Sequence, residues 1–261
     1  MEKRRVIYYT DELNDEFSTA VIQPRKIDGD YKYVHTSLFK RFTHFFWYRM
    51  VATPIAFLYT KLAHRHKAVG KARLKEYRRC GYFMYGNHTH HMCDAVIPSL
   101  LTVPKDTYVI VHPNNVSMPY LGRVTPSMGA LPLPDDMAAY RNFISAIKRR
   151  LREGCAVAVY PEAHIWPYYT GIRSFPDTSF SYPVKFGVPI FVFTNTYQKR
   201  GRSKKPRVVT YIDGPFMPDR SLSPKEAAKK LRDEAYTAMC ERARLSDFEL
   251  IKYIKKEKTN D

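Results

Sequence analysis

Stretches with the composition of buried strands alternate with stretches that carry a helical pattern along most of this chain. Residues 81–86 predict a strand, residues 94–101 a helix and residues 107–112 a second strand. Strands separated by helices pair in parallel and carry those helices on the sheet faces, because a parallel connection must cross over the sheet. The alternation therefore predicts an α/β fold, a single domain with a mixed, mostly parallel sheet flanked by helices and with functional groups at strand ends.

Termination signals mark where the later helices begin and end. Residues 136–153 carry one apolar stripe and a basic last turn, and Gly154 follows, as expected for an amphipathic helix with a defined C-terminus. Ser223-Pro224-Lys225-Glu226 has the form of a capping box with proline at the first helical position, and this helix is expected to end near Ala243. Further strands are expected at residues 155–160, 188–194 and 207–213.

The composition indicates a protein with one hydrophobic core that resides in a reducing compartment. The chain has 261 residues, of which 44% are hydrophobic, enough for a single α/β domain with appended helices. The spacing of its four cysteines does not indicate a disulfide framework. The charged start of the chain is not followed by an apolar core, so no signal peptide is expected. These features predict a cytoplasmic protein.

The only long apolar stretch, residues 45–62, is broken by Arg49 and Pro54. Its charge-free part is about 16 Å long as a helix, against about 30 Å for the hydrocarbon core of a bilayer. Aromatic residues within it and basic residues after it are typical of a helix lying in the headgroup region. We therefore expect an N-terminal segment with an interfacial helix, residues 1–68, and an α/β domain, residues 69–261. The alternative is a helix packed on the domain core.

The formal net charge is +18, and basic residues recur in clusters along the chain. Such a surface attracts anionic lipid headgroups, with about 1 kcal/mol for each basic residue near the membrane. It would attract nucleic acid as well, but no RNA-binding or DNA-binding motif accompanies the charge. The expected partner is therefore an anionic membrane surface, at the inner face of the cell membrane, and nucleic acid is not expected.

A histidine and a carboxylate stand close together after the strand expected at residues 81–86. His88 and Asp94 are six positions apart and would not share a face of one helix, so the chain must turn before a helix begins. An imidazole can take a proton from an alcohol near neutral pH, and a carboxylate can fix its tautomer and stabilise the imidazolium. No serine or cysteine nucleophile motif accompanies the pair. It predicts direct transfer of a group to a hydroxyl activated by His88.

This histidine cluster allows two other interpretations. His90 is a competing base, with three residues between it and Asp94. A zinc site formed by His88, His90 and His91 is the second alternative, but the chain has no Cys-x-x-Cys pair and no His-Glu-x-x-His helix. We therefore expect neither a metal nor another cofactor.

Four segments resemble, in order and spacing, the motifs of the glycerolipid (lysophospholipid) acyltransferases, the family typified by 1-acylglycerol-3-phosphate acyltransferase. They are Asn87-His88 followed by Asp94, Tyr120-Leu121-Gly122-Arg123 through Pro134, Tyr160-Pro161-Glu162-Ala163, and Val188-Pro189-Ile190. Five residues separate the histidine from the aspartate where the family usually has four, a spacing associated with a divergent bacterial branch. The resemblance implies that His88 is the catalytic base and that Asp94 orients it.

The same resemblance implies what the protein does. The expected reaction moves a fatty acyl group from acyl-CoA or acyl carrier protein to the free hydroxyl of a lysophospholipid, with 1-acylglycerol-3-phosphate as the main candidate. Glu162 and Arg173 are implied in substrate binding, the guanidinium by gripping the acceptor phosphate. Arg123 and Lys185 are further candidates for that phosphate. In the family's third motif an arginine closely follows the glutamate, whereas the next arginine after Glu162 here is Arg173. This departure and the His88–Asp94 spacing leave open a catalytically inactive relative that binds lipid at the membrane surface.

Overall fold

The computed structural model describes residues 5–17, 23–34 and 37–256. Its central element is a seven-stranded sheet with the order β2-β8-β7-β3-β6-β4-β5, in which β7 and β8 are antiparallel and the other neighbours are parallel. The strands are β2 (Lys67–Val69), β3 (Tyr82–Gly86), β4 (Thr107–Val111), β5 (Ala130–Pro132), β6 (Ala156–Val159), β7 (Ile190–Gln198) and β8 (Arg207–Phe216). The predicted mixed, mostly parallel sheet is confirmed.

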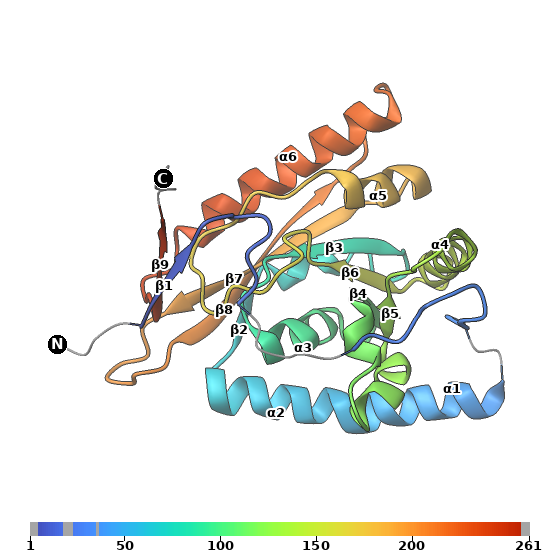
Figure 1. The fold of residues 1–261 in the computed structure, drawn as a ribbon, viewed down its shortest axis with the longest axis horizontal. Helices are drawn as coiled ribbons and strands as arrows, with labels where there is room; N and C mark the ends of the chain where they lie inside the picture. Colours follow the sequence, from blue (N-terminus) through green and yellow to red (C-terminus); the bar gives the residue numbers. More distant parts are fainter. Residues whose placement is uncertain (1–4, 18–22, 35–36, 257–261) are drawn as a thin grey trace.

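Helices cover both faces of this sheet, with α3 on one face and α4, α5 and α6 on the other (Figure 1). These helices are α3 (His91–Thr102), α4 (Met137–Arg152), α5 (Ser181–Phe186) and α6 (Pro224–Ala243). Short 3-10 turns occur at η2 (Lys71–Leu74), η3 (Pro113–Val116), η4 (Leu121–Arg123), η5 (Thr125–Met128) and η6 (Thr178–Phe180). The long helices and strands agree with the sequence prediction within a few residues, whereas α5, β2 and β5 were not expected.

The side chains of β3 explain why the core has two sides. Tyr82 and Met84 pack with α3 on one face, whereas Phe83 and Tyr85 pack with α4 and α6 on the other. All four are almost fully buried, so this strand is apolar on both faces rather than alternating with polar residues. As the middle strand of the sheet, β3 places the residues that follow Gly86 at the centre of one sheet edge.

A continuous helical rod runs across the bottom of the molecule in Figure 1. It consists of α1 (Leu38–Phe45), the π-helical stretch η1 (Phe46–Ala52) and α2 (Thr53–His64). Its inner side is fastened to the start of β4. The Tyr48 hydroxyl donates to the Thr107 carbonyl at 3.2 Å and accepts the Thr107 N–H at 2.8 Å. Arg49, which interrupts the apolar stretch, pairs with Asp106.

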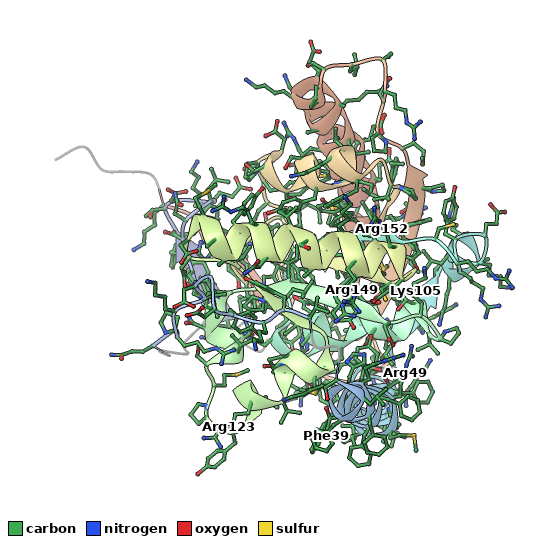
Figure 2. The ribbon with its side chains drawn as sticks, turned by 90° about the vertical axis from the view of Figure 1, so that its right-hand side faces the viewer. Phe39, Arg49, Lys105, Arg123, Arg149 and Arg152 are labelled. Carbon is green, nitrogen blue, oxygen red and sulfur yellow. The ribbon has the colours of Figure 1, made fainter. Side chains whose placement is uncertain are left out.

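The outer side of this rod is apolar and exposed. Its exposed large side chains include Leu38, Phe39, Phe42, Phe45, Met50, Ile55, Phe57, Leu58 and Leu62. Figure 2 shows Phe39 on the side facing away from the sheet and Arg49 on the side facing it. The rod is thus packed on the domain along one side and open along the other. The alternative of a helix packed on the domain describes the inner side, and the interfacial helix stays a prediction for the outer side. Within the described ranges, no helix has both the length and the apolarity needed to cross a bilayer.

Two short strands from distant parts of the chain pair beside the main sheet. β1 (Arg5–Tyr9) lies parallel to β9 (Ile251–Lys255) and outside the seven-stranded sheet. Aromatic rings join this pair to the loop that follows β6, because Tyr9 and Tyr253 lie 4.7 Å and 5.0 Å, centroid to centroid, from Trp166. The sequence analysis did not predict either strand.

Candidate active site

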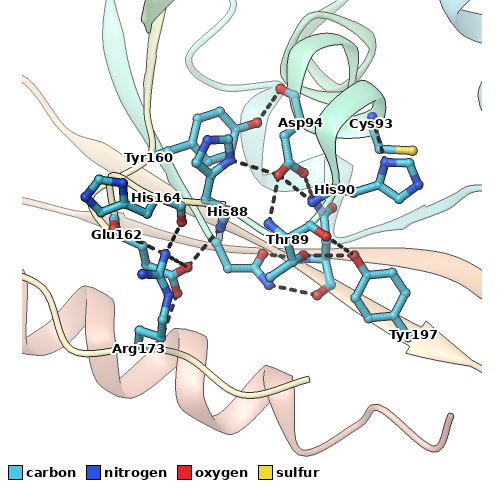
Figure 3. Close-up of polar contacts among 12 residues, drawn as sticks. His88, Thr89, His90, Cys93, Asp94, Tyr160, Glu162, His164, Arg173 and Tyr197 are labelled. Carbon is cyan, nitrogen blue, oxygen red and sulfur yellow. Dashed lines mark hydrogen bonds and ion pairs between the residues drawn. The ribbon is translucent and has the colours of Figure 1, made fainter. Parts of the chain in front are cut away.

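His88 and Asp94 meet at the edge of the sheet where β3 ends (Figure 3). The chain turns after Gly86 and α3 begins only at His91, so the turn expected between the two residues is present. The Nδ1 atom of His88 lies 3.0 Å from Oδ2 of Asp94. The imidazole keeps 18% of its side-chain surface exposed, whereas the aspartate side chain is buried. A substrate can therefore reach the pair only at the His88 ring.

The Asp94 carboxylate is held on both oxygens. Oδ2 accepts the backbone N–H groups of Thr89 and His90, each at 2.8 Å, in addition to the imidazole. Oδ1 accepts the side-chain amide of Asn195 at 3.1 Å. Asp94 also lies in the first turn of α3, where a negative charge interacts favourably with the helix dipole. These contacts fix the carboxylate in one orientation toward His88.

The same contacts select one form of the His88 ring. An ionised carboxylate only accepts hydrogen bonds, so Nδ1 carries the proton and Nε2 is the basic nitrogen. Among the residues that the structure describes, Nε2 has no hydrogen-bond partner. The ring stacks on Tyr160 at a centroid distance of 4.6 Å, and the Tyr160 hydroxyl donates to the Asp94 carbonyl. The imidazole is thus oriented with a free basic nitrogen, the arrangement that a general base requires.

His90, the competing base, has a different place. It is the N-cap of α3, with the Cys93 N–H donating to its Nδ1 at 3.2 Å. Burial lowers the pKa of His90, although the Asp94 charge acts in the opposite direction. Its contact with the Asp94 carboxylate is through its backbone N–H, not through its ring. The geometry therefore pairs His88 with Asp94.

Glu162 lies behind the His88 loop, just beyond the end of β6. Its Oε2 accepts the His88 backbone N–H at 3.1 Å, and its Oε1 accepts the Arg173 backbone N–H at 3.2 Å. The side chain is fully buried. Burial raises the pKa of Glu162, and the charge of Arg173 and the two backbone N–H groups oppose that rise. Glu162 thus connects the His88 loop to the loop after β6.

Arg173 is equally buried, with 1% of its surface exposed. Its Nη2 lies 3.3 Å from Glu162 Oε2 and also donates to the carbonyls of Glu162 and His164. Its Nη1 donates to the Glu12 carbonyl at 3.3 Å, and the guanidinium carbon lies 4.9 Å from the Trp166 ring centroid. The structure directs this guanidinium at protein groups rather than at an open surface. This geometry does not support the expected grip on an acceptor phosphate.

Lys185 is not brought to His88. It lies exposed on α5, directly before β7 begins at Ile190, whereas His88 follows the end of β3 at Gly86. Since β3 and β7 are parallel neighbours, the start of one and the end of the other lie at opposite ends of the sheet. The sequence position of Lys185 next to the Val188-Pro189-Ile190 segment gave no indication of which end it would occupy.

Arg123 lies on the exposed turn η4 and is itself exposed. The neighbouring turn η5 contacts α1 and η1 of the rod. Figure 2 places Arg123 on the same lower side of the molecule as Phe39. Its guanidinium therefore faces the side on which the rod exposes its apolar residues.

Asn195 was missed by the sequence analysis. Besides binding Asp94, it is joined to Asn87 by two reciprocal contacts: its N–H donates to the Asn87 side-chain oxygen at 2.8 Å, and the Asn87 amide donates to its carbonyl at 3.0 Å. The available signal was a buried polar run, Thr194-Asn195-Thr196, continuing a strand that begins as Ile190-Phe191-Val192-Phe193. Polar side chains buried in a strand require partners, and those of Asn195 are Asn87 and Asp94, whereas Thr196 donates to the Val209 carbonyl on β8.

A model of the acyltransferase family matches residues 65–194. This range includes the strands that form the site edge, together with His88, Asp94, Glu162 and Arg173. The chain belongs to the acyltransferase family. The match explains why an oriented histidine is present without a nucleophilic serine or cysteine beside it, since an acyl group can pass directly to an activated hydroxyl.

The acyltransferase also resembles a solved structure, the 1-acyl-sn-glycerophosphate (LPA) acyltransferase PlsC from Thermotoga maritima. The two share 19% sequence identity with a TM-score of 0.55, and the match covers 79% of this chain and 88% of that chain. At this identity the likeness shows a common fold. A comparison of this acyltransferase with curated proteins found no match.

Proposed function

We propose that this acyltransferase moves a fatty acyl group from a thioester donor to the free hydroxyl of 1-acylglycerol-3-phosphate, giving phosphatidic acid for phospholipid synthesis. The observation that carries the proposal is the oriented pair of His88 and Asp94, 3.0 Å apart at the sheet edge. The acyltransferase match supports the reaction class, and the fold shared with an LPA acyltransferase supports the acceptor. The donor is acyl-CoA or acyl carrier protein.

The proposed chemistry needs one proton transfer and one acyl exchange. His88 Nε2 removes the hydroxyl proton as the acceptor oxygen attacks the thioester carbonyl, and Asp94 stabilises the imidazolium. The tetrahedral intermediate then expels the thiolate, which takes up the proton, and an ester remains on the acceptor. Glu162 acts as a positioning residue, because it holds the backbone N–H of His88. Arg173 in turn holds Glu162.

The acceptor phosphate requires a cation that solvent can reach. Arg173 and Lys185 do not meet this requirement at His88, the first because it is buried and the second because it lies at the other end of the sheet. Arg123 is exposed on the side of the apolar rod face. We therefore assign Arg123 as the first candidate for the phosphate of a lysophospholipid held at that surface.

The rod is proposed to rest on an anionic membrane at the inner face of the cell membrane. Its exposed aromatic and aliphatic side chains would enter the headgroup region, while basic residues such as Lys61 and Arg65 at its end would face lipid phosphates. Figure 2 shows further basic residues on the α/β domain above the rod, namely Lys105, Arg149 and Arg152. A lysophospholipid and its acylated product are both amphiphiles, so a site beside this surface would exchange them with the bilayer.

The exposed aromatic residues of α1 are expected to carry much of the membrane affinity. Replacing both Phe39 and Phe42 by serine should weaken binding to anionic vesicles by at least ~10-fold, since burying one such ring contributes about 1.5–3 kcal/mol. Vesicle flotation measures this. Tyr8→Ser removes an exposed ring on β1, away from the rod, and is the matched control. Equal binding by the double variant and the parent would contradict the proposed membrane face.

Acceptor and donor can be assigned by one assay on the unmodified protein. We expect free thiol to be released from acyl-CoA or acyl carrier protein only when lysophosphatidate is present, with slower release for lysophosphatidylcholine, whose headgroup has no net charge. Equal rates for all lysophospholipids would reject phosphate recognition while keeping the reaction class. Lipid binding without thiol release from any donor and acceptor pair would favour the inactive relative.

A further inference from the structure

Three buried side chains that can bind metals converge beside the catalytic loop. His64 is the last residue of α2, His90 is the N-cap of α3, and Cys93 lies in the first turn of α3. One ring nitrogen of each histidine and the Cys93 sulfur all lie within 4.8 Å of one another. We infer that His64, His90 and Cys93 form a binding site for a borderline-soft divalent metal ion such as Zn²⁺.

The contacts with tyrosine hydroxyls favour the same tautomer on both rings. The Nε2 atom of His64 lies 3.1 Å from the Tyr59 hydroxyl, whereas its Nδ1 is buried without a hydrogen-bond partner. His90 has its Nε2 3.4 Å from the Tyr168 hydroxyl. Each imidazole can therefore give its Nε2 proton to a tyrosine and offer the Nδ1 lone pair to a metal. Ligating histidines in metal sites have such an outer partner, which fixes their tautomer.

One existing contact would be exchanged on binding. The Nδ1 of His90 accepts the Cys93 N–H at 3.2 Å, a long hydrogen bond, and the metal bond would take the place of that contact (Figure 3). Ligand atoms in a tetrahedral zinc site lie roughly 3.3–3.5 Å apart, as follows from bond lengths of ~2.0–2.3 Å. A small side-chain rotation would contract the cluster to that size. Three protein ligands leave a fourth position for water or another small ligand.

The three side chains supply a donor set of two imidazole nitrogens and one sulfur, gathered from α2 and α3. A bound cation would displace the thiol proton to solvent and form a metal–thiolate bond, with no oxidation or reduction. Two imidazoles and a thiolate favour Zn²⁺ over Mg²⁺ or Ca²⁺, which prefer oxygen ligands.

The site would link two parts of the molecule that have different tasks. His64 ends the rod, whereas His90 donates its backbone N–H to the Asp94 carboxylate and Cys93 directly precedes Asp94 in the first turn of α3. A metal at this position would tie the exposed helical rod to the catalytic loop. The inference does not depend on the acyl donor or acceptor, because it concerns a site separate from the His88 imidazole.

Cobalt provides the test, because a thiolate ligand gives Co²⁺ a near-ultraviolet charge-transfer absorption that oxygen and nitrogen ligands do not. The metal-free, reduced full-length protein should bind one equivalent of Co²⁺ with this absorption, and Zn²⁺ should displace it. Cys93→Ala and His64→Gln should remove the absorption or weaken binding at least tenfold. Cys155→Ala and His66→Gln change another buried thiol and another buried imidazole, and they should bind as the parent does.

A measurement on the unmodified protein makes the test independent of how the variants fold. X-ray absorption of the zinc-loaded protein should show one sulfur and two imidazoles around the metal. A zinc shell without sulfur, an absorption retained in folded Cys93→Ala, or no stoichiometric binding of Co²⁺ or Zn²⁺ would each overturn the inference.

Discussion

Replacement of His88 by alanine is expected to lower the rate of acyl transfer by about 10²–10⁴-fold, the contribution usual for a positioned general base. The loss should appear in kcat, because the ring acts on the proton that moves in the transition state rather than on acceptor binding. The fold should persist, since the imidazole is partly exposed and makes one side-chain hydrogen bond, to Asp94. Thiol release with lysophosphatidate as acceptor is the measurement.

His91→Ala is the matched control for that experiment. His91 is exposed at the start of α3 and lies three positions from His88, so it shares the local sequence without the contact to Asp94. This variant should keep the parent rate. If His88→Ala kept the parent rate and His90→Ala lost it, the base would have been assigned to the wrong histidine.

Replacement of Arg173 by alanine is expected to lower the free energy of unfolding by about 3–5 kcal/mol, because it leaves the buried Glu162 carboxylate without its cation. For a domain of this size such a loss corresponds to a fall in Tm of roughly ten degrees. The ion pair is buried on both sides, with side-chain exposures of 1% and 0%. Thermal unfolding followed by circular dichroism measures the effect.

A surface ion pair provides the comparison. Arg149 and Glu153 form an exposed pair on α4 with a distance of 2.9 Å, so Arg149→Ala should cost less than ~1 kcal/mol. Comparison of Arg173→Ala with Arg149→Ala also separates a structural role of Arg173 from a phosphate-binding role. An unchanged Tm together with a large rise in KM for lysophosphatidate alone would restore the phosphate-binding role that the sequence suggested.

Local signals were enough to predict much of this fold. The capping box at Ser223 is present, with the Ser223 Oγ accepting the Glu226 N–H and the Glu226 carboxylate accepting the Ser223 N–H. The strands that bury both faces could be recognised as apolar runs, and the turn between His88 and Asp94 followed from helical geometry once the two residues were taken to pair. In each case the residues that decide the structure are close together in the sequence.

Features that depend on distant partners were not predicted. Arg173 lies farther behind Glu162 than the family's usual arginine, and its phosphate-binding role was an expectation from the resemblance. Its surroundings are set by Trp166 and by Glu12, which is near the start of the chain. The contact of Asn195 with Asp94 likewise requires β7 to lie beside β3. From the sequence, a zinc site formed by His88, His90 and His91 is an alternative that is not expected, whereas the structure groups His90 with His64 and Cys93.

The pairing of β3 also determines the order in which the enzyme can become active during synthesis. β3 is made early, but its two neighbours in the sheet are β6 and β7, which come much later in the chain. Until both have left the ribosome, the strand that leads to His88 has two open edges, a state prone to aggregation. The nascent chain therefore carries His88, the proposed base, long before Asn195, which binds Asp94, has been made. Assembly of the active site is a late, long-range event in folding.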